Sequence, residues 1–164
     1  MNLFRTISIA TISLKKRKLT LFFLGGVTLL LFMILTIINK PLINRTTPNG
    51  IISFELAKTF SNSEIILTSW EQTEKQYAAL SLGLDYLFMF AYSLFLCLSI
   101  LIISDSFKNR NHFLFLSGFY LAWLQLLAAI FDGFENYFLI KLLFGSQLEL
   151  FSQLAFYFAS IKFF

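Results

Sequence analysis

The sequence predicts an all-α integral membrane protein that forms one domain over residues 1–164, with four membrane-spanning helices. Of its 164 residues, 57% are hydrophobic and 13% are charged, whereas charged residues make up roughly 25% of a typical soluble domain. Apolar runs long enough to cross the roughly 30 Å hydrocarbon core of a bilayer recur along the chain. The basic residues gather beside particular runs, as they do at the cytoplasmic ends of membrane helices.

The first predicted span covers residues 19–38, a run of twenty residues without a charge. At a rise of about 1.5 Å per residue, such a helix crosses the hydrocarbon core. A basic cluster at 15–18 precedes the run and assigns its N-terminal end to the cytoplasm. The run is too long for a signal peptide and no cleavage site follows it before Lys40, so we expect an uncleaved anchor. Residues 1–14 suggest a short interfacial helix.

Residues 40–75 form the one long polar segment, which we assign to the outer side of the membrane. Two short helices are expected in it, over 51–59 and 61–70. In the second, Ser61 can cap the helix while Glu64 reaches back in a capping box. Because the segment is too short to enclose a core of its own, it is expected to pack on the membrane ends of the helices.

The next two spans are predicted at 78–103 and 113–131, joined by a polar loop that is expected in the cytoplasm. The third span returns to the outer side at Asp132. The residues beyond it stay mostly apolar, so the pattern allows either a helix that continues past Gly133 or a break there.

The fourth span is predicted over 146–164, just long enough to cross the membrane. Gly145 is expected to end the preceding helix. Ser146, with Glu149 three residues later, matches a second capping box. This topology assigns both termini to the cytoplasm.

The distribution of charge supports this topology. The predicted cytoplasmic side carries eight basic residues and one acid, which are Arg5, Lys15, Lys16, Arg17, Lys18, Lys108, Arg110, Lys162 and Asp105. The outer side carries five basic and eight acidic residues, which are Lys40, Arg45, Lys58, Lys75, Lys141, Glu55, Glu64, Glu71, Glu74, Asp85, Asp132, Glu135 and Glu149. The positive charge is thus sorted by membrane side. We expect a plasma (inner) membrane protein whose partners are the lipid bilayer and, as candidates, other membrane subunits, but no nucleic acid.

Ionisable residues within the spans are the candidates for function, because an isolated one costs roughly 2.5–3.5 kcal/mol on insertion scales. Asp85 lies just inside the outer end of the second span. Three further polar residues lie at the outer end of the third span: Asp132, Glu135 and Asn136. Helical spacing puts these three on one face. We expect them to meet Asp85 in one coupled site at the outer membrane boundary.

Two stripes at helical spacing favour this meeting. The third span carries small and polar residues at Gly118, Ala122, Gln125, Ala129, Asp132 and Asn136. The second span carries a comparable stripe at Ser81, Asp85, Met89 and Tyr92. Small and polar stripes permit close packing and hydrogen bonds between membrane helices. We therefore expect the two stripes to face each other.

Three interpretations of the acidic group remain open. The acids can be hydrogen-bonded by Asn136, Gln125 and Tyr92 and serve only to fix helix register. They can form a binding or catalytic pocket open to the outer leaflet, or part of a proton or cation route. Glu55 and Trp70 can close such a pocket as a lid. Alternatively, Glu55 is a solvated helix residue and Trp70 an anchor in the aromatic belt.

No metal site is expected, and the cofactor, if any, is unknown. Cys97 and His112 are the only residues of their kinds, whereas thiolate and histidine metal sites need several ligands. No Ser-His-Asp arrangement, P-loop or dinucleotide-binding motif occurs, so enzymatic activity stays open. The sequence favours a binding or interaction protein, either a small subunit of a membrane assembly or a binder of a lipid or small cationic ligand. The alternatives are a membrane-embedded enzyme acting on a lipid-like substrate and a component of proton or cation translocation.

Several short motifs resemble a group of small, uncharacterised bacterial multi-pass membrane proteins. The motifs are Phe54-Glu55-Leu56-Ala57, Ser69-Trp70, Gly83-Leu84-Asp85-Tyr86-Leu87-Phe88 with Ala91-Tyr92, and Asp132-Gly133-Phe134-Glu135-Asn136. The resemblance covers roughly residue 50 to the end. It implies a bacterial inner-membrane protein and brings no activity with it.

Overall fold

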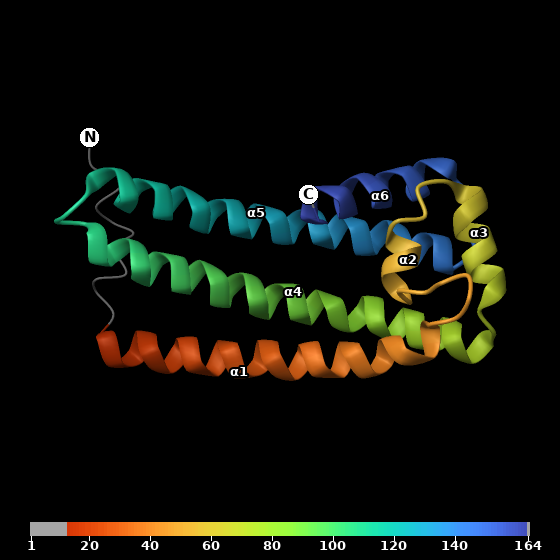
Figure 1. The fold of residues 1–164 in the computed structure, drawn as a ribbon, viewed down its shortest axis with the longest axis horizontal. Helices are drawn as coiled ribbons and strands as arrows, with labels where there is room; N and C mark the ends of the chain where they lie inside the picture. Colours follow the sequence, from red (N-terminus) through yellow and green to blue (C-terminus); the bar gives the residue numbers. More distant parts are fainter. Residues whose placement is uncertain (1–12, 164) are drawn as a thin grey trace. The chain divides into compact units, whose positions relative to one another are not determined.

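The computed structural model describes residues 13–163, and every regular element in that range is a helix (Figure 1). In chain order these are α1 (Leu14–Asn39), the 3-10 turn η3 (Lys40–Leu42), α2 (Ile51–Glu55), α3 (Phe60–Ser69), α4 (Gln72–Phe107), α5 (His112–Leu143) and α6 (Glu149–Phe163). The all-α prediction is confirmed. The interfacial helix predicted over 1–14 falls almost wholly outside the described residues.

Three of the described helices, α1, α4 and α5, are long and apolar enough to cross a membrane. With 36 and 32 residues, α4 and α5 extend beyond the predicted spans 78–103 and 113–131. The 15 residues of α6 rise about 22 Å, less than the roughly 30 Å of the hydrocarbon core. The predicted fourth span is therefore not confirmed by the length of its helix.

Gly145, and not Gly133, ends the third long helix. α5 continues through Gly133 to its end. Gly145 then adopts a positive φ of 91°, and its N–H donates to the Leu142 carbonyl at 3.0 Å. The next N–H, that of Ser146, donates to the Lys141 carbonyl at 3.0 Å. This pair of bonds is a Schellman motif, in which glycine adopts the left-handed conformation at least cost.

Both predicted capping boxes are wrong. α3 begins before Ser61 and is capped by Thr59, whose hydroxyl accepts a backbone hydrogen bond at 3.3 Å. α6 begins at Glu149, so Ser146 lies outside the helix that it was expected to cap. The Glu149 carboxylate instead accepts the backbone N–H of Phe60 at 2.9 Å. A tertiary contact between α6 and α3 thus replaces the local bond that the sequence pattern suggested.

The described chain divides into two compact units. The first consists of the described part of Met1–Leu29 together with Ala91–Leu127. The second consists of Leu30–Phe90 together with the described part of Ala128–Phe164. Each of the three long helices contributes one segment to each unit.

Polar and close-packed contacts hold the helices of the first unit together. Arg17 of α1 forms an ion pair with Asp105 of α4 at 3.1 Å. The Ser104 hydroxyl donates to the Phe115 carbonyl of α5 at 2.7 Å. A Cβ added at Gly118 would lie only 2.6 Å from Cβ of Ser104. Glycine therefore permits the close approach of α4 and α5, in agreement with the predicted small-residue stripe.

In the second unit the polar segment packs on the helix ends, as predicted. We call η3, α2, α3 and their connections, residues 40–71, the cap. Cap and helices share one core of buried residues, which are Leu42, Phe54, Ala57, Ile66, Trp70, Ala78, Leu82, Leu139, Leu142 and Ala155. The Leu42 carbonyl accepts hydrogen bonds from Trp70 Nε1 at 3.1 Å and from Thr47 Oγ1 at 2.6 Å. The Trp70 bond ties the beginning of the cap to its end, and the Thr47 bond closes the turn that follows Leu42.

The last helix, α6, is held by both the cap and α5. The buried hydroxyls of Ser152 in α6 and Ser63 in α3 lie 3.1 Å apart. On its other side, the Phe158 ring stacks on Phe134 and Phe138 of α5, with centroids 5.9 and 6.0 Å apart. α6 thus docks on a helix that is long enough to cross the membrane.

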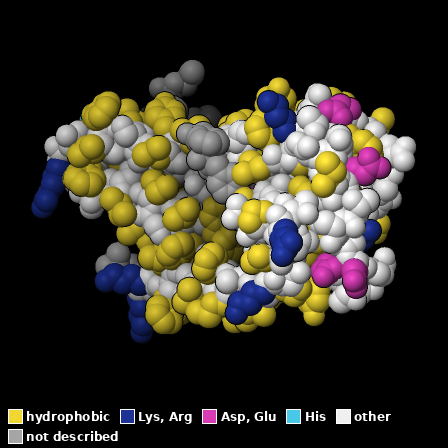
Figure 2. Space-filling view, turned by 45° about the vertical axis from the view of Figure 1, so that its right-hand side comes forward, with side chains coloured by type: hydrophobic (Ala, Val, Ile, Leu, Met, Phe, Trp, Pro, Cys, Tyr) yellow, Lys and Arg dark blue, Asp and Glu magenta, His cyan; other side chains and the backbone are white. Residues whose placement is uncertain are grey.

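Apolar side chains cover much of the surface, as Figure 2 shows for one face. Phe22 of α1 and Phe113 of α5 are 83% and 75% exposed. Large rings along helices of this length are suited to face lipid rather than water. The acidic side chains visible in Figure 2 gather at one end, and Glu64, Glu71 and Glu149 are exposed acids of the cap and of the start of α6.

We predict that Ala122→Phe lowers the yield of folded protein and the stability of the first unit. Ala122 in α5 is 1% exposed, and overpacking a close-packed position costs roughly 1–3 kcal/mol. The control is Leu121→Phe, because the neighbouring Leu121 is 54% exposed. Size-exclusion yield and thermal unfolding in detergent measure the effect. If both variants behave like the unmodified chain, Ala122 does not pack as described.

Candidate functional site

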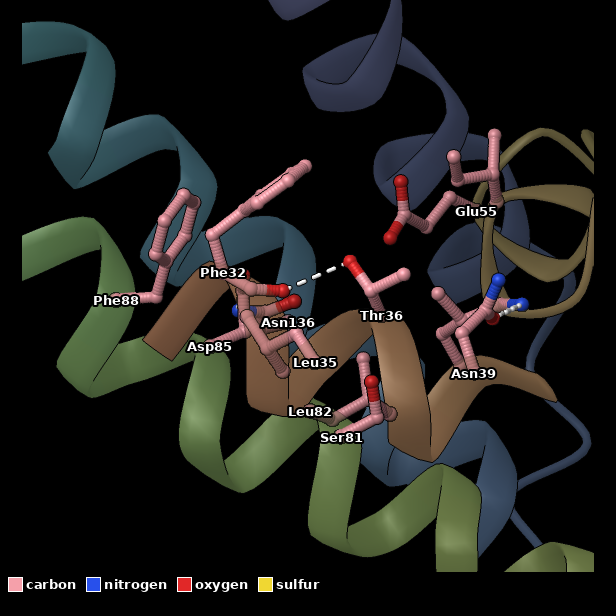
Figure 3. Close-up of a pocket in the computed structure, with 12 residues that line it drawn as sticks. Phe32, Leu35, Thr36, Asn39, Glu55, Ser81, Leu82, Asp85, Phe88 and Asn136 are labelled. Atoms are coloured by element: carbon pink, nitrogen blue, oxygen red, sulfur yellow. Dashed lines mark hydrogen bonds between the residues drawn. The ribbon is translucent and has the colours of Figure 1, made fainter. Parts of the chain in front are cut away.

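A pocket of about 340 Å³ lies in the second unit, lined by α1, α2, α4 and α5 (Figure 3). Its polar lining residues are Thr36, Asn39, Glu55, Ser81, Asp85 and Asn136. Its apolar lining residues are Phe32, Leu35, Ile51, Ile52, Leu82 and Phe88. The described lining thus combines two carboxyl groups with no basic side chain.

Asp85 and Asn136 form the polar link between α4 and α5 in this pocket. Asn136 Nδ2 donates to Asp85 Oδ2 at 2.7 Å. Asn136 is 2% exposed and Asp85 is partly buried. A second bond joins the same helices, because the Tyr86 hydroxyl donates to the Gly133 carbonyl at 3.0 Å. The predicted convergence of Asp85 with the group on the third span is confirmed for Asn136.

Small and flexible residues let α4 and α5 come together beside the pocket. A Cβ added at Gly133 would lie 3.5 Å from Cε of Met89. Ser81 and Met89, one turn on either side of Asp85, are 4% and 8% exposed. The two predicted stripes therefore meet at Asp85 and Asn136, whereas Met89 lies next to Gly133, which is outside the predicted stripe.

Glu55 approaches the pocket from the cap, and its side chain is 9% exposed. Figure 3 shows its carboxyl group extending away from α2 toward the pocket. Asn39 positions this short helix: its Oδ1 accepts the Ile51 N–H at 2.8 Å, and its Nδ2 donates to the Asn49 carbonyl at 3.3 Å. Gly50 has a φ of 61°, and a Cβ there would collide with the Asn39 side chain. The interpretation of Glu55 as a solvated residue is therefore wrong.

Trp70 is neither a lid nor an interfacial anchor. It is 2% exposed, and its Nε1 donates to the Leu42 carbonyl. Its ring meets Phe54 edge to face, with centroids 5.7 Å apart. An aromatic-belt residue would present its ring to the interface, whereas this one forms the core of the cap. Trp70 contributes to the site indirectly, by packing against the residue that precedes Glu55.

The structure separates the predicted acidic group into two parts. Asp85 and Asn136 line the pocket, while Asp132 and Glu135 do not. Asp132 and Glu135 are nevertheless buried, with 6% and 0% exposure. Glu55 supplies the second carboxyl group of the pocket in their place. Sequence spacing could not distinguish these positions, because one stripe of a helix contacts several neighbours at different points along its width.

Two further predicted site residues lie in the first unit. Tyr92 of α4 and Gln125 of α5 are partly buried, and neither lines the pocket. Among residues 13–163, no three His, Cys, Asp or Glu side chains are placed to hold a metal ion. The candidate site is therefore a pocket with two carboxyl groups and neutral hydrogen-bonding groups.

The contribution of α1 to the pocket was missed by sequence reasoning. Phe32, Thr36 and Asn39 line it from the last turns of this helix. Their spacing of four and three residues places them on one helical face. Two polar side chains on one face at the end of an apolar run were a signal available in the sequence.

Comparison with known proteins assigns no relative to this chain: no protein family, curated protein or solved structure matches it. The resemblance carried by the short motifs stays a prediction. The geometry and chemistry of the pocket are therefore the basis for its function.

We predict that Asp85→Ala and Asn136→Ala each lower the free energy of unfolding. In the double variant the decrease should be smaller than the sum of the two single decreases. A hydrogen bond to a charged group contributes about 1.5–3 kcal/mol, so a coupling energy on the order of 1–2 kcal/mol is expected. Denaturant unfolding in detergent measures this cycle. As a control, the changes in unfolding free energy caused by Asp85→Ala and Asn62→Ala should be additive. Asn62 donates its hydrogen bond to the Ala57 carbonyl in the cap and not to Asp85. Additivity in the first cycle would contradict the described bond.

Proposed function

We propose that this protein is a membrane binding protein whose pocket holds the positively charged head of an amphipathic ligand, such as an amine-bearing lipid. One observation carries the proposal. Glu55 from the cap and Asp85 from α4 line a single pocket that otherwise contains neutral polar and apolar residues. An enzyme or a translocation route would use the same acids, but no further observation favours either.

The charge of the pocket favours a cation. Two carboxyl groups brought into a partly dry site must share protons, be hydrogen-bonded or meet an opposite charge. Asn136 donates a hydrogen bond to Asp85 at 2.7 Å and carries no charge of its own. An ammonium group offers three donors for carboxylate oxygens, so it matches a lining that contains two carboxyl groups and no basic side chain better than an anion would.

The shape of the pocket favours a ligand with an apolar portion. Phe32, Leu35 and Phe88 form walls close to the acids, and Phe32 is itself 56% exposed on α1. A volume of about 340 Å³ lies at the small end of the roughly 300–1,000 Å³ typical of ligand pockets. It suits a head group with the beginning of an acyl chain, while the rest of the chain stays in lipid.

We predict that Asp85→Asn and Glu55→Gln each weaken binding of a fluorescent long-chain alkylammonium by roughly tenfold or more, since each removes one charge-assisted contact. The full chain in mild detergent is titrated with the probe, and a fluorescent alcohol of the same length provides the uncharged comparison. Asp132→Asn is the matched control, because Asp132 is buried in α5 outside the pocket lining.

Two outcomes would oppose the proposal. Either the pocket variants bind the probe as tightly as the unmodified chain, or Asp132→Asn loses as much affinity as they do. Circular dichroism and size exclusion establish that each variant is folded before it is titrated. Lipids that copurify with the chain should also contain amine-bearing head groups in excess over their share of the membrane.

We further infer a topology with both termini in the cytoplasm of a bacterial cell, four membrane segments in the inner membrane, and the cap on the outer side. The charge asymmetry of the sequence supports this orientation, and the resemblance of the motifs supports the bacterial membrane. α6 serves as the fourth segment in this proposal. Its packing on Phe134 and Phe138 supports that role, and local thinning of the bilayer can accommodate its short length.

The topology predicts the labelling pattern of single cysteines introduced into a Cys97→Ser background. Cysteines at Ser13 and Asn109 should be protected from an impermeant thiol reagent in intact cells and become reactive after lysis. A cysteine at Ser61 should be labelled in intact cells. All three positions are exposed in the structure. Protection of a cysteine from the reagent would therefore show that the membrane separates the two, and not that the cysteine is buried in the protein. Labelling at Asn109 in intact cells would reverse the orientation.

A further inference from the structure

A second hollow, of about 600 Å³, lies in the first unit between α1 and α4. Gly25 and Gly26 of α1 form part of its wall, and Phe95 of α4 borders it. A Cβ at Gly25 would approach the Phe95 ring to 3.0 Å, whereas a Cβ at Gly26 would meet nothing within 4 Å. The groove thus exists partly because a side chain is missing where α1 could carry one.

The lining of this groove is apolar except for one cation. Lys18 is its only charged lining residue in the described chain, and Leu21, Phe22, Leu29 and Phe95 supply its large apolar side chains. Lys18 is exposed, as are its neighbours Lys15 and Lys16. The fourth member of the basic cluster, Arg17, is engaged with Asp105 instead. Positive charge is therefore concentrated where the groove begins.

The length of the groove matches one leaflet of a bilayer. Lys18 and Leu29 are eleven residues apart, which corresponds to about 16 Å along a helix. Half of the hydrocarbon core is about 15 Å. A cation at one end of the groove is thus joined to an apolar lining about as long as one leaflet of the hydrocarbon core.

We propose that this groove binds one acyl chain of an anionic phospholipid, with the lipid phosphate held by Lys18. The charge at the entrance selects a negative head group, and the glycine pair makes room for the chain. Lys15 and Lys16 increase the local attraction for anionic lipids near the surface. This site is separate from the acidic pocket: it lies in the other unit, and its charge has the opposite sign.

The test compares phosphatidylglycerol with phosphatidylcholine of identical acyl chains, added to the full chain in detergent and counted as bound lipid by native mass spectrometry. The unmodified chain should retain phosphatidylglycerol preferentially. Lys18→Gln should reduce its affinity by roughly tenfold, as expected for loss of a charge-assisted phosphate contact, while Lys18→Arg should preserve it. Lys108→Gln is the control, because Lys108 is exposed and lies outside the groove.

A second variant tests the groove independently of charge. Gly26→Leu should fill the hollow and weaken binding of phosphatidylglycerol, with the basic cluster intact. Gly83→Leu is its control, because Gly83 is also a helical glycine with nothing within 4 Å of an added Cβ. Circular dichroism and size exclusion show whether both variants are folded.

Three results would overturn the proposal. The first is equal retention of the two lipids by the unmodified chain. The second is a loss in Lys108→Gln or Gly83→Leu as large as in the paired groove variant, which would indicate general electrostatic attraction or general destabilisation. The third is displacement of phosphatidylglycerol by glycerol phosphate at equal concentration, which would show that the head group alone is recognised.

Discussion

Polar groups inside a membrane must find their partners within the protein, because the hydrocarbon core offers none. In this chain α4 and α5, which are long and apolar enough to cross a membrane, are paired by such internal hydrogen bonds. In the second unit they are joined by the Asp85–Asn136 and Tyr86–Gly133 hydrogen bonds, and in the first by the bond from Ser104. In the first unit the close approach of the two helices depends on Gly118, because an added Cβ there would lie 2.6 Å from Cβ of Ser104. The remaining elements pack around this pair within each unit.

The acidic pocket depends on a second layer of structure, the cap. Asp85 is supplied by α4, which is long and apolar enough to cross a membrane, but Glu55 is supplied by a five-residue helix that would not be stable alone. Asn39 caps that helix, and the bonds from Trp70 and Thr47 to the Leu42 carbonyl close the segment around it. The packing of the cap on the helix ends thus positions the Glu55 carboxyl group relative to that of Asp85. The presence of two carboxyl groups in one pocket depends on this packing.

The acidic pocket and the groove have opposite electrostatic character. The pocket of the second unit contains carboxyl groups, whereas the groove of the first unit begins at a lysine cluster. The apolar portion of each is formed by side chains suited to contact hydrocarbon. The two proposed sites therefore present charges of opposite sign to a ligand, which is the basis for proposing a cationic head group at one and an anionic head group at the other.

The all-helical class and the long apolar helices were determined by composition and periodicity. A helix of roughly 20 apolar residues forms its backbone hydrogen bonds internally, whatever surrounds it. The stripe of small and polar residues from Gly118 to Asn136 could likewise be predicted from the 3.6-residue repeat of a helix alone. Tertiary structure decided which acids share a pocket. Glu55 lies 30 residues from Asp85 in sequence, while Glu135, next to Asn136, does not line the pocket. It also decided that Glu149 caps α3 rather than its own helix, because an accessible backbone N–H on a neighbouring element competes with the local partner.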